Sequence, residues 1–270
     1  MLKQIKQYLK EKGVKRPLQV VPSRMLYPFG IETQYSTAIV KLLRPMKVLV
    51  KEYLIPQITK WKNEYKKDDW SDDITTTIEG IEFRYFEQTN TEQLVLPYAE
   101  KTDKFNKKQF DKQTKSMIGI NPLTAEPWLQ SLEASWVREN VILIKSISTE
   151  YFKDIEGVVR RGVQSGTITK DIAEEIGARF KVSKNKAKLI ARDQVCKYNG
   201  YLTKERSTDI GLTHFIWTNS NDGNRVRPQH RNATGYGGNK YSWKLGADGD
   251  FPGTPIQCRC VAINDYSIFF

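Results

Sequence analysis

The chain has 270 residues, of which 39% are hydrophobic and 11% aromatic, and this globular composition excludes a disordered polypeptide. No apolar run approaches the ~20 residues of a membrane helix, and the basic N-terminus lacks the apolar segment of a secretory signal, so we expect neither. Three cysteines are too few for a disulfide scaffold and odd in number, which favours a reducing compartment.

The chain has a net charge of +12, and many of its basic side chains are concentrated in three blocks. Residues 1–24 carry seven basic side chains against one acidic, residues 41–67 eight against two, and residues 181–231 eleven against four, whereas residues 68–100 carry nine acidic side chains and one arginine. Lysine-rich blocks suit a polyanion, because each contact with a phosphate releases condensed counterions. A solvated lysine-rich surface explains any one block equally well. We expect non-specific contact with double-stranded DNA, although the acidic block argues against a uniform DNA coat.

The N-terminal third alternates breakers with helical patterns. Residues 1–33 contain several prolines and glycines and are typical of an arm with one short helix. Apolar residues then recur at helical spacing, but Pro45 and Pro56 interrupt them, so we expect a kinked or broken helix. Ser71 is a plausible N-cap for the helix that follows, with a β-hairpin as the competing interpretation because of three threonines at 75–77.

The middle of the chain contains the strongest helical signals. Residues 91–117 are typical of a polar, lysine-rich helix, and residues 121–128 of a loop. Residues 129–161 form an amphipathic helical pattern, which we expect Gly162 and Gly166 to end. The apolar stripe of that helix consists of Ile144, Ile147, Tyr151, Phe152, Ile155 and Val158.

Residues 169–195 have the spacing of a helix-turn-helix. Thr169 and Ser183 are candidate caps for two short helices joined by a brief turn. The basic residues of the second helix are the candidate nucleic-acid contacts: Lys184, Lys186, Lys188 and Arg192. A plain helical hairpin with exposed lysines is the simpler interpretation, since a reading helix usually offers more asparagine, glutamine or arginine for base edges.

The pattern changes again beyond Gly211. Residues 214–218 (HFIWT) and 257–264 (QCRCVAIN) are typical of strands, and residues 219–256 are rich in turn formers. The predicted fold class is therefore mainly α, an elongated helical body with a small C-terminal α+β, loop-rich cap. We expect an N-terminal arm at 1–33, a helical body at 34–210 and the cap at 211–270.

So long a loop-rich stretch needs something to hold its ends, because ordering the backbone costs ~1 kcal/mol or more per residue. The candidates are pairing between residues 214–218 and 257–263, Trp217 and Trp243 as core anchors, and a cluster around His230.

A run of charged residues follows the first of these strands. Arg225 and Arg227 lie two residues apart, and Pro228 favours an extended conformation before it. On an extended segment the two arginines share a face, where they can hold carboxylates or phosphates. In the simpler interpretation, Asp222 pairs with one of them and the arginines stabilise the loop.

His230, Cys258 and Cys260 are the candidate metal ligands. Two thiols two residues apart on a strand share a face, and with the imidazole they form a possible zinc site that Cys196, Asp222 or water completes. Alternatively, the thiols are small core residues. A disulfide between Cys258 and Cys260 would be strained, so we expect none.

These features come in an ordered series. A helix ending in Ala-Arg precedes a glycine, an aromatic strand with tryptophan, Asp–x–x–Arg–x–Arg–x–x–His, a glycine turn, and Pro-Gly before Cys-Arg-Cys. The residues are Ala191, Arg192, Gly211, Trp217, Asp222, Arg225, Arg227, His230, Gly235, Pro252, Gly253, Cys258, Arg259 and Cys260. Over about residues 136–264 the chain resembles the Mu F-like minor head (head morphogenesis) proteins of tailed bacteriophages. It departs from many relatives at Asp193-Gln194, where they have Thr-Glu.

The resemblance implies a low-copy virion protein in the capsid interior at the portal vertex, present in the host cytoplasm during assembly. The partners it implies are the portal protein, the major capsid or scaffolding protein, and packaged DNA. No enzymatic activity follows from it, and apart from the candidate zinc ion we expect no cofactor. Two rival functions stay open: a helix-turn-helix DNA-binding protein, and a metal-dependent nuclease built on Asp222, His230 and the cysteines. The motif offers the nuclease no second carboxylate for two-metal chemistry.

Overall fold

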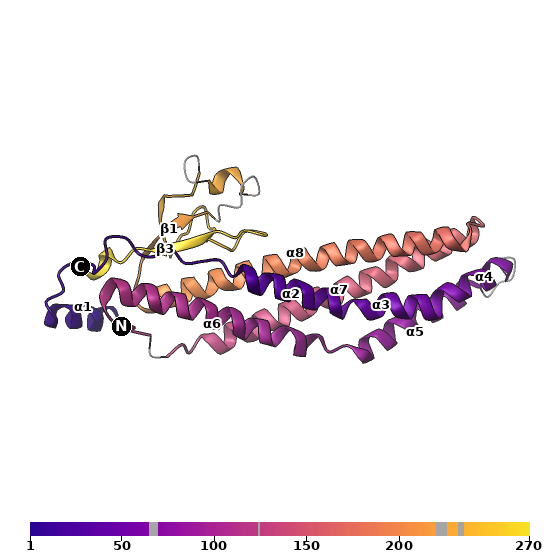
Figure 1. Ribbon diagram of the computed structural model, residues 1–270, viewed down its shortest axis with the longest axis horizontal. Helices are drawn as coiled ribbons and strands as arrows, with labels where there is room; N and C mark the ends of the chain where they lie inside the picture. Colours follow the sequence, from indigo (N-terminus) through magenta and orange to yellow (C-terminus); the bar gives the residue numbers. More distant parts are fainter. Residues whose placement is uncertain (65–69, 124, 220–225, 232–234) are drawn as a thin grey trace. The chain divides into compact units, whose positions relative to one another are not determined.

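The computed structural model describes residues 1–64, 70–123, 125–219, 226–231 and 235–270 (Figure 1). Its α-helices are α1 (Leu2–Glu11), α2 (Phe29–Leu42), α3 (Arg44–Leu49), α4 (Ile55–Glu64), α5 (Trp70–Gln88), α6 (Thr91–Ile118), α7 (Leu129–Gln164) and α8 (Thr169–Asp209). Its strands are β1 (His214–Thr218), β2 (Lys240–Ser242) and β3 (Val261–Asn264). The fold is therefore mainly α with a small α+β part near the C-terminus, as predicted. No helix in these residues is long and apolar enough to cross a membrane.

The chain forms two compact units, each assembled from separate segments. Unit 1 contains residues 1–32, 98–136 and 192–270, and unit 2 contains residues 33–97 and 137–191. The predicted arm, body and cap are each one continuous stretch of the chain, whereas the two units are not. The division into arm, body and cap stays a prediction.

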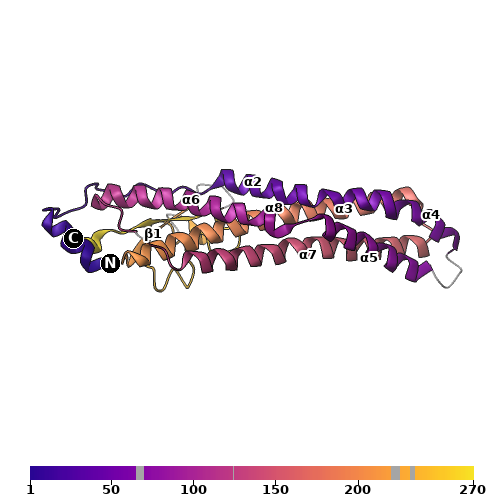
Figure 2. The same ribbon diagram turned by 90° about the horizontal axis from the view of Figure 1, so that it is seen from below.

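Unit 2 is a set of helices with an apolar core. The stripe predicted on α7 is buried throughout, which confirms it. Along α5 and α7 the contacts run in opposite directions, since Ser71 meets Arg160 near one end while Tyr85 meets Ser148 near the other. The two helices are therefore antiparallel neighbours (Figure 2). The hairpin predicted as an alternative at residues 71–81 is wrong, because Ile74, Ile78 and Ile81 instead bury one helical face.

Both predicted proline interruptions are present in unit 2. The helix that begins as α2 ends at Leu42, and Pro45 stands in the first turn of α3, where its missing N–H is unused. A π-helical turn at Val50–Leu54 then leads into α4, with Pro56 in its first turn. Pro56 has no backbone N–H, so one helical hydrogen bond is missing there, and the π-helical turn before it accommodates this loss. The prediction of a broken helix is confirmed.

Two predicted helix boundaries in unit 2 are wrong. Ser71 is not a cap, because α5 already includes Trp70, and the Ser71 hydroxyl instead accepts a hydrogen bond of 2.6 Å from Arg160. Gly162 does not end α7, which continues to Gln164. A β-carbon at Gly162 would lie 2.5 Å from Cδ1 of Ile172, so the glycine allows α8 to approach α7 closely.

The helix-turn-helix and the plain hairpin predicted at 169–195 are both wrong, because α8 is one continuous helix. No glycine or proline occurs between residues 178 and 199, so nothing in that stretch breaks the helical hydrogen bonds. Ser183 lies inside the helix, and its hydroxyl donates to the carbonyl of Arg179 at 3.3 Å. A serine that satisfies its hydroxyl in this way does not need to begin a new helix.

Unit 1 contains the three-stranded antiparallel sheet, in the order β2-β1-β3. Phe215 on β1 pairs with Tyr241 on β2, and Trp217 pairs with Ala262 on β3. Figure 1 shows β1 and β3 side by side, which confirms the predicted strand pairing. Trp217 and Trp243 are 0% and 2% exposed, as expected of core anchors, and the same core includes Ile5 of α1, Phe110 of α6 and Tyr266.

Candidate functional site

The candidate site lies in unit 1, beside the buried face of β1. Residues alternate along β1, so Phe215 and Trp217 point into the core while His214, Ile216 and Thr218 are partly exposed. Aromatic and β-branched side chains favour this half-buried strand. Trp217 is fully buried, and its ring packs edge-on against His230 and Tyr236.

A short 3-10 helix, Pro228–His230, positions the histidine. Arg227 has an extended backbone (φ −57°, ψ 145°), as predicted for a residue before proline. Pro228 occupies the first helical position, and one turn later His230 is buried at 2% exposure. The Arg227 guanidinium donates to the carbonyl of Ile256 at 2.8 Å and so ties this helix to the segment before β3.

Cys258 and Cys260 were expected on a strand, which is wrong: β3 begins only at Val261. The preceding residues form a turn in which the N–H of Cys258 donates to Pro255 at 2.9 Å and Gln257 has φ +56°. The N–H of Cys260 lies 3.4 Å from Sγ of Cys258. The turn nevertheless directs both thiols inward, where the cysteines are 6% and 4% exposed.

These elements bring His230, Cys258 and Cys260 together as a thiol–imidazole cluster. Nδ1 of His230 lies 3.4 Å from Sγ of Cys258 and 3.6 Å from Sγ of Cys260. All three ligand atoms lie within 4.8 Å of one another. The predicted proximity of His230 to both cysteines is therefore confirmed, although 28 or more residues separate them in the sequence.

Two aromatic rings hold the imidazole of His230. Tyr236 stacks on it with ring centroids 5.8 Å apart and an angle of 25°, and Trp217 packs against it edge-on at 5.0 Å. Among the described residues, Nε2 of His230 is buried and has no hydrogen-bond partner. In the part of the chain that the structure describes, the polar contacts of the ring are made by Nδ1, which faces the thiols.

The two kinds of buried thiol differ in their electrostatics. Hydrogen bonding by Cys260, and secondarily by His230, lowers the pKa of the Cys258 thiol to about 5, although burial opposes the shift. Burial raises the pKa of the Cys196 thiol well above its usual value. Cys196 is not part of the cluster, and its Sγ lies 3.3 Å from the hydroxyl of Tyr27. Its predicted role as fourth metal ligand is therefore not supported by the geometry.

A cavity of about 300 Å³ adjoins the cluster. Its lining combines the three cluster residues with Arg192, Val226, Arg227, Ile256, Gln257 and Arg259. Arg259 is paired with Glu32, with Nε 2.9 Å from a carboxylate oxygen, so a carboxylate offsets its charge. The cavity gives small solutes access to an otherwise buried site.

Gly200 of α8 and the motif glycines Gly235 and Gly253 allow close backbone approaches. A β-carbon at Gly200 in α8 would lie 2.6 Å from the carbonyl oxygen of Pro252, and one at Gly253, where φ is +94°, would lie 2.7 Å from that of Cys196. A β-carbon at Gly235 would lie 2.0 Å from the carbonyl oxygen of Gln229. At the Pro252-Gly253 pair, the backbone of the loop therefore lies directly against α8.

The remaining predicted residues fall in different places. Asp222 and Arg225 lie outside the described residues. Lys184, Lys186 and Lys188 lie on the continuous α8, with Lys186 paired to Glu150. Arg192, also predicted to contact nucleic acid, lines the cavity.

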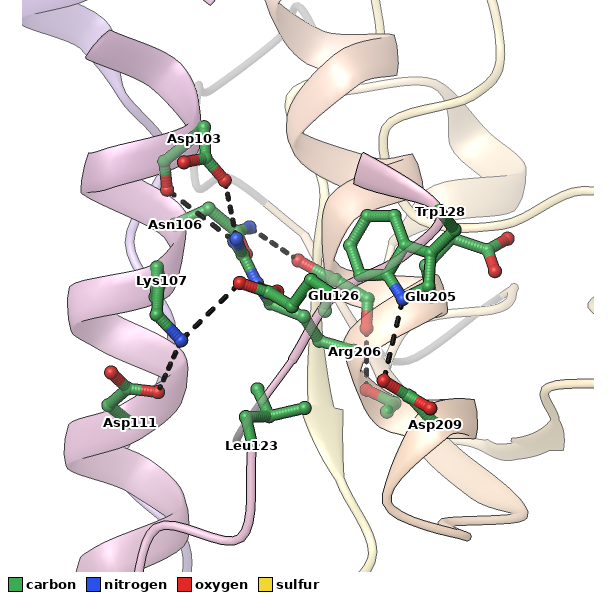
Figure 3. A network of polar contacts seen from close by, with 12 residues as sticks. Asp103, Asn106, Lys107, Asp111, Leu123, Glu126, Trp128, Glu205, Arg206 and Asp209 are labelled. Carbon is green, nitrogen blue, oxygen red and sulfur yellow. Dashed lines mark hydrogen bonds and ion pairs between the residues drawn. The ribbon is translucent and has the colours of Figure 1, made fainter. Parts of the chain in front are cut away.

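Sequence reasoning missed a buried polar network centred on Arg206 of α8 (Figure 3). The Arg206 side chain is 0% exposed; Nε lies 2.6 Å from Glu126, Nη1 2.7 Å from Asn106, and Nη2 pairs with Asp103. The sequence did offer one signal for its burial. Arg206 falls four residues after Leu202 and eight after Tyr198, which are both fully buried, and this spacing puts all three on the same face of the helix.

Comparison with known proteins finds a similarity in the C-terminal part of the chain. Residues 153–263 match the family described as Phage Mu protein F like protein. A Haemophilus influenzae (strain Rd) protein described as uncharacterized is 36% identical over 124 residues, which is 46% of this chain and 27% of that protein. The chain thus matches about a quarter of that relative's length. No solved structure matches the chain significantly. Over residues 153–263, the chain is therefore similar to the Phage Mu protein F-like family.

Proposed function

We propose that this chain is a minor head protein of a tailed bacteriophage and acts in head morphogenesis. The observation that carries the proposal is the family match over residues 153–263, which contains α8, the sheet and the thiol–imidazole cluster. In this role the protein associates with the portal and the inner capsid, and no enzymatic step is required of it.

The charge of the chain supports a position beside packaged DNA. The three basic blocks of the sequence carry net charges of +6, +6 and +7, which outweigh the net acidic remainder of the chain, and Lys184 and Lys188 on α8 are not fully buried. Basic side chains distributed in this way attract the phosphate backbone without reading its sequence. The proposed partners are therefore the portal protein, a major capsid or scaffolding protein, and double-stranded DNA.

Cryo-electron microscopy of phage heads tests the location. Heads that contain this protein should show density for it at the portal vertex, and heads assembled without it should lack that density. The control is a set of heads that lack an unrelated minor protein, in which the density should persist. Density spread evenly over the capsid shell, or absence of the protein from purified heads, would contradict the proposal.

A nuclease assay tests whether the protein is structural. We expect no cleavage of DNA by the purified protein with magnesium or manganese. Divalent-metal-dependent cleavage that disappears on Asp222→Asn would replace the structural function with the nuclease alternative.

A further inference from the structure

The thiol–imidazole cluster matches the dimensions of a zinc site. Zinc binds sulfur at about 2.3 Å and imidazole nitrogen at about 2.0–2.1 Å, and a tetrahedral angle between them puts nitrogen and sulfur about 3.6 Å apart. The observed distances from Nδ1 of His230 are 3.4 Å to Cys258 and 3.6 Å to Cys260. Both sulfur–nitrogen edges of a tetrahedral site are therefore present.

Hydrogen bonding alone accounts less well for this arrangement. The Nδ1 atom of an imidazole has one site for a proton or a lone pair, so it makes one good hydrogen bond. Here two sulfur atoms converge on that atom at nearly equal distances. Three polar groups buried together around one point are typical of metal ligands, because the ion replaces the solvation that each of them has lost.

The surroundings of the cluster also suit a bound ion. Trp217 and Tyr236 fix the plane of the imidazole, so its ligating nitrogen is held toward the thiols before any metal binds. Two thiolates neutralise the charge of a zinc ion, and the occupied site adds no net charge to a cavity lined by three arginines. Because all three cluster residues line that cavity, the ion can enter from solvent.

We propose that Nδ1 of His230 and the thiolates of Cys258 and Cys260 bind a zinc ion whose fourth position faces the cavity. The ion ties the 3-10 helix Pro228–His230 to the turn before β3 and so closes the long loop-rich segment between β1 and β3. This site does not depend on whether the chain acts in phage heads.

Metal analysis of the full chain, purified without a polyhistidine tag or chelators, tests the site. We expect stoichiometric zinc in the wild-type protein. Loss of a residue that only orients a metal ligand lowers metal affinity by up to roughly 100-fold. Cys258→Ser, Cys260→Ser and His230→Gln each remove a ligand itself, so each should lower zinc affinity by more than this. Cys196→Ser is the matched control, because it removes another buried thiol that is not part of the cluster, and it should retain zinc.

A spectroscopic measurement on the unaltered protein covers the case in which the cluster variants fail to fold. Cobalt(II) in place of zinc should give the intense visible bands of a tetrahedral site and a thiolate-to-metal charge-transfer band. Chelation should speed hydrogen exchange in residues 226–231 and 257–264 while leaving α5 and α7 protected. A wild-type protein that takes up neither zinc nor cobalt overturns the proposal, as does a Cys258→Ser variant that binds zinc like the wild type.

Discussion

Arg206 shows how far the effect of one side chain depends on its burial. Its guanidinium is fully buried and pairs with Asp103 and Glu126, which are themselves 16% and 9% exposed (Figure 3). Taking such charges out of water is costly, and only well-placed partners offset the cost. The ion pairs of Arg206 with the two carboxylates therefore add little to the free energy of unfolding. Removing the arginine, however, leaves both carboxylates without a counter-charge.

We expect Arg206→Ala to lower the free energy of unfolding by about 3–5 kcal/mol, because it leaves Asp103 and Glu126 unpaired in a buried setting. Urea denaturation of the variant and the wild type measures this difference. Arg179→Ala is the matched control: Arg179 also lies on α8 and pairs with a carboxylate, but its side chain is 40% exposed. It should cost less than about 1 kcal/mol. Equal losses in the two variants would contradict the role assigned to burial.

At the scale of elements, α8 contains two glycines in different settings. Nothing lies within 4 Å of a β-carbon built at Gly177, whereas one built at Gly200 meets the backbone of the Pro252-Gly253 segment. In a helix interior, glycine is less favourable than alanine by about 1 kcal/mol. Alanine should therefore be the more stable residue wherever its β-carbon meets no such contact. The two positions therefore separate helix propensity from packing.

Alanine substitutions at these glycines should act in opposite directions. Gly200→Ala should destabilise the protein by roughly 1–3 kcal/mol, since the backbone facing it cannot rotate away as a side chain can. Gly177→Ala should stabilise it by up to about 1 kcal/mol. Thermal denaturation followed by circular dichroism compares both with the wild type. A stabilising Gly200→Ala would mean that the loop does not rest against α8.

At the scale of the whole molecule, the distribution of charge sets the expected mode of DNA binding. The basic blocks recur at intervals along the chain, and with α8 continuous the candidate contacts Lys184, Lys186 and Lys188 no longer begin a recognition helix. Binding through such residues depends on the number of phosphates neutralised and not on base sequence.

We therefore expect DNA affinity to fall at least about tenfold between low and physiological salt, with no preference among sequences. Fluorescence anisotropy with unrelated duplexes measures both properties. Replacing Lys184 and Lys188 by alanine should reduce the salt slope by about 1 per lysine that contacts phosphate. Lys104→Ala, on α6 where the lysine pairs with Glu100, is the control and should leave the slope unchanged. Binding that is independent of salt, or selective for one sequence, would count against the proposed contact with packaged DNA.

Much of the secondary structure follows from the sequence alone. The spacing of apolar residues in α7, the prolines at 45 and 56, and the alternation in β1 are local properties that favour one backbone conformation. The series of tryptophan, arginine, histidine and Cys-Arg-Cys likewise carries the resemblance to the Mu F-like family over residues 153–263, because it is an order of residues and not an arrangement in space. Helix ends were predicted less well, since Ser71 and Ser183 suit a cap and a helix interior alike.

The sequence predicted that His230 meets the two thiols, but only the tertiary structure decided the geometry of that contact and the other contacts between distant residues. His230 lies beside the thiols because a turn, and not the predicted strand, orients Cys258 and Cys260. Arg206 is buried because Asp103 and Glu126, which lie at least 80 residues away, converge on it. Contacts of this kind depend on how segments pack after the chain has closed long loops, and neither spacing nor composition encodes that packing. The sequence therefore determined most of the elements, the resemblance to a family and the residues of the cluster, while packing determined the geometry of the site and the buried charges.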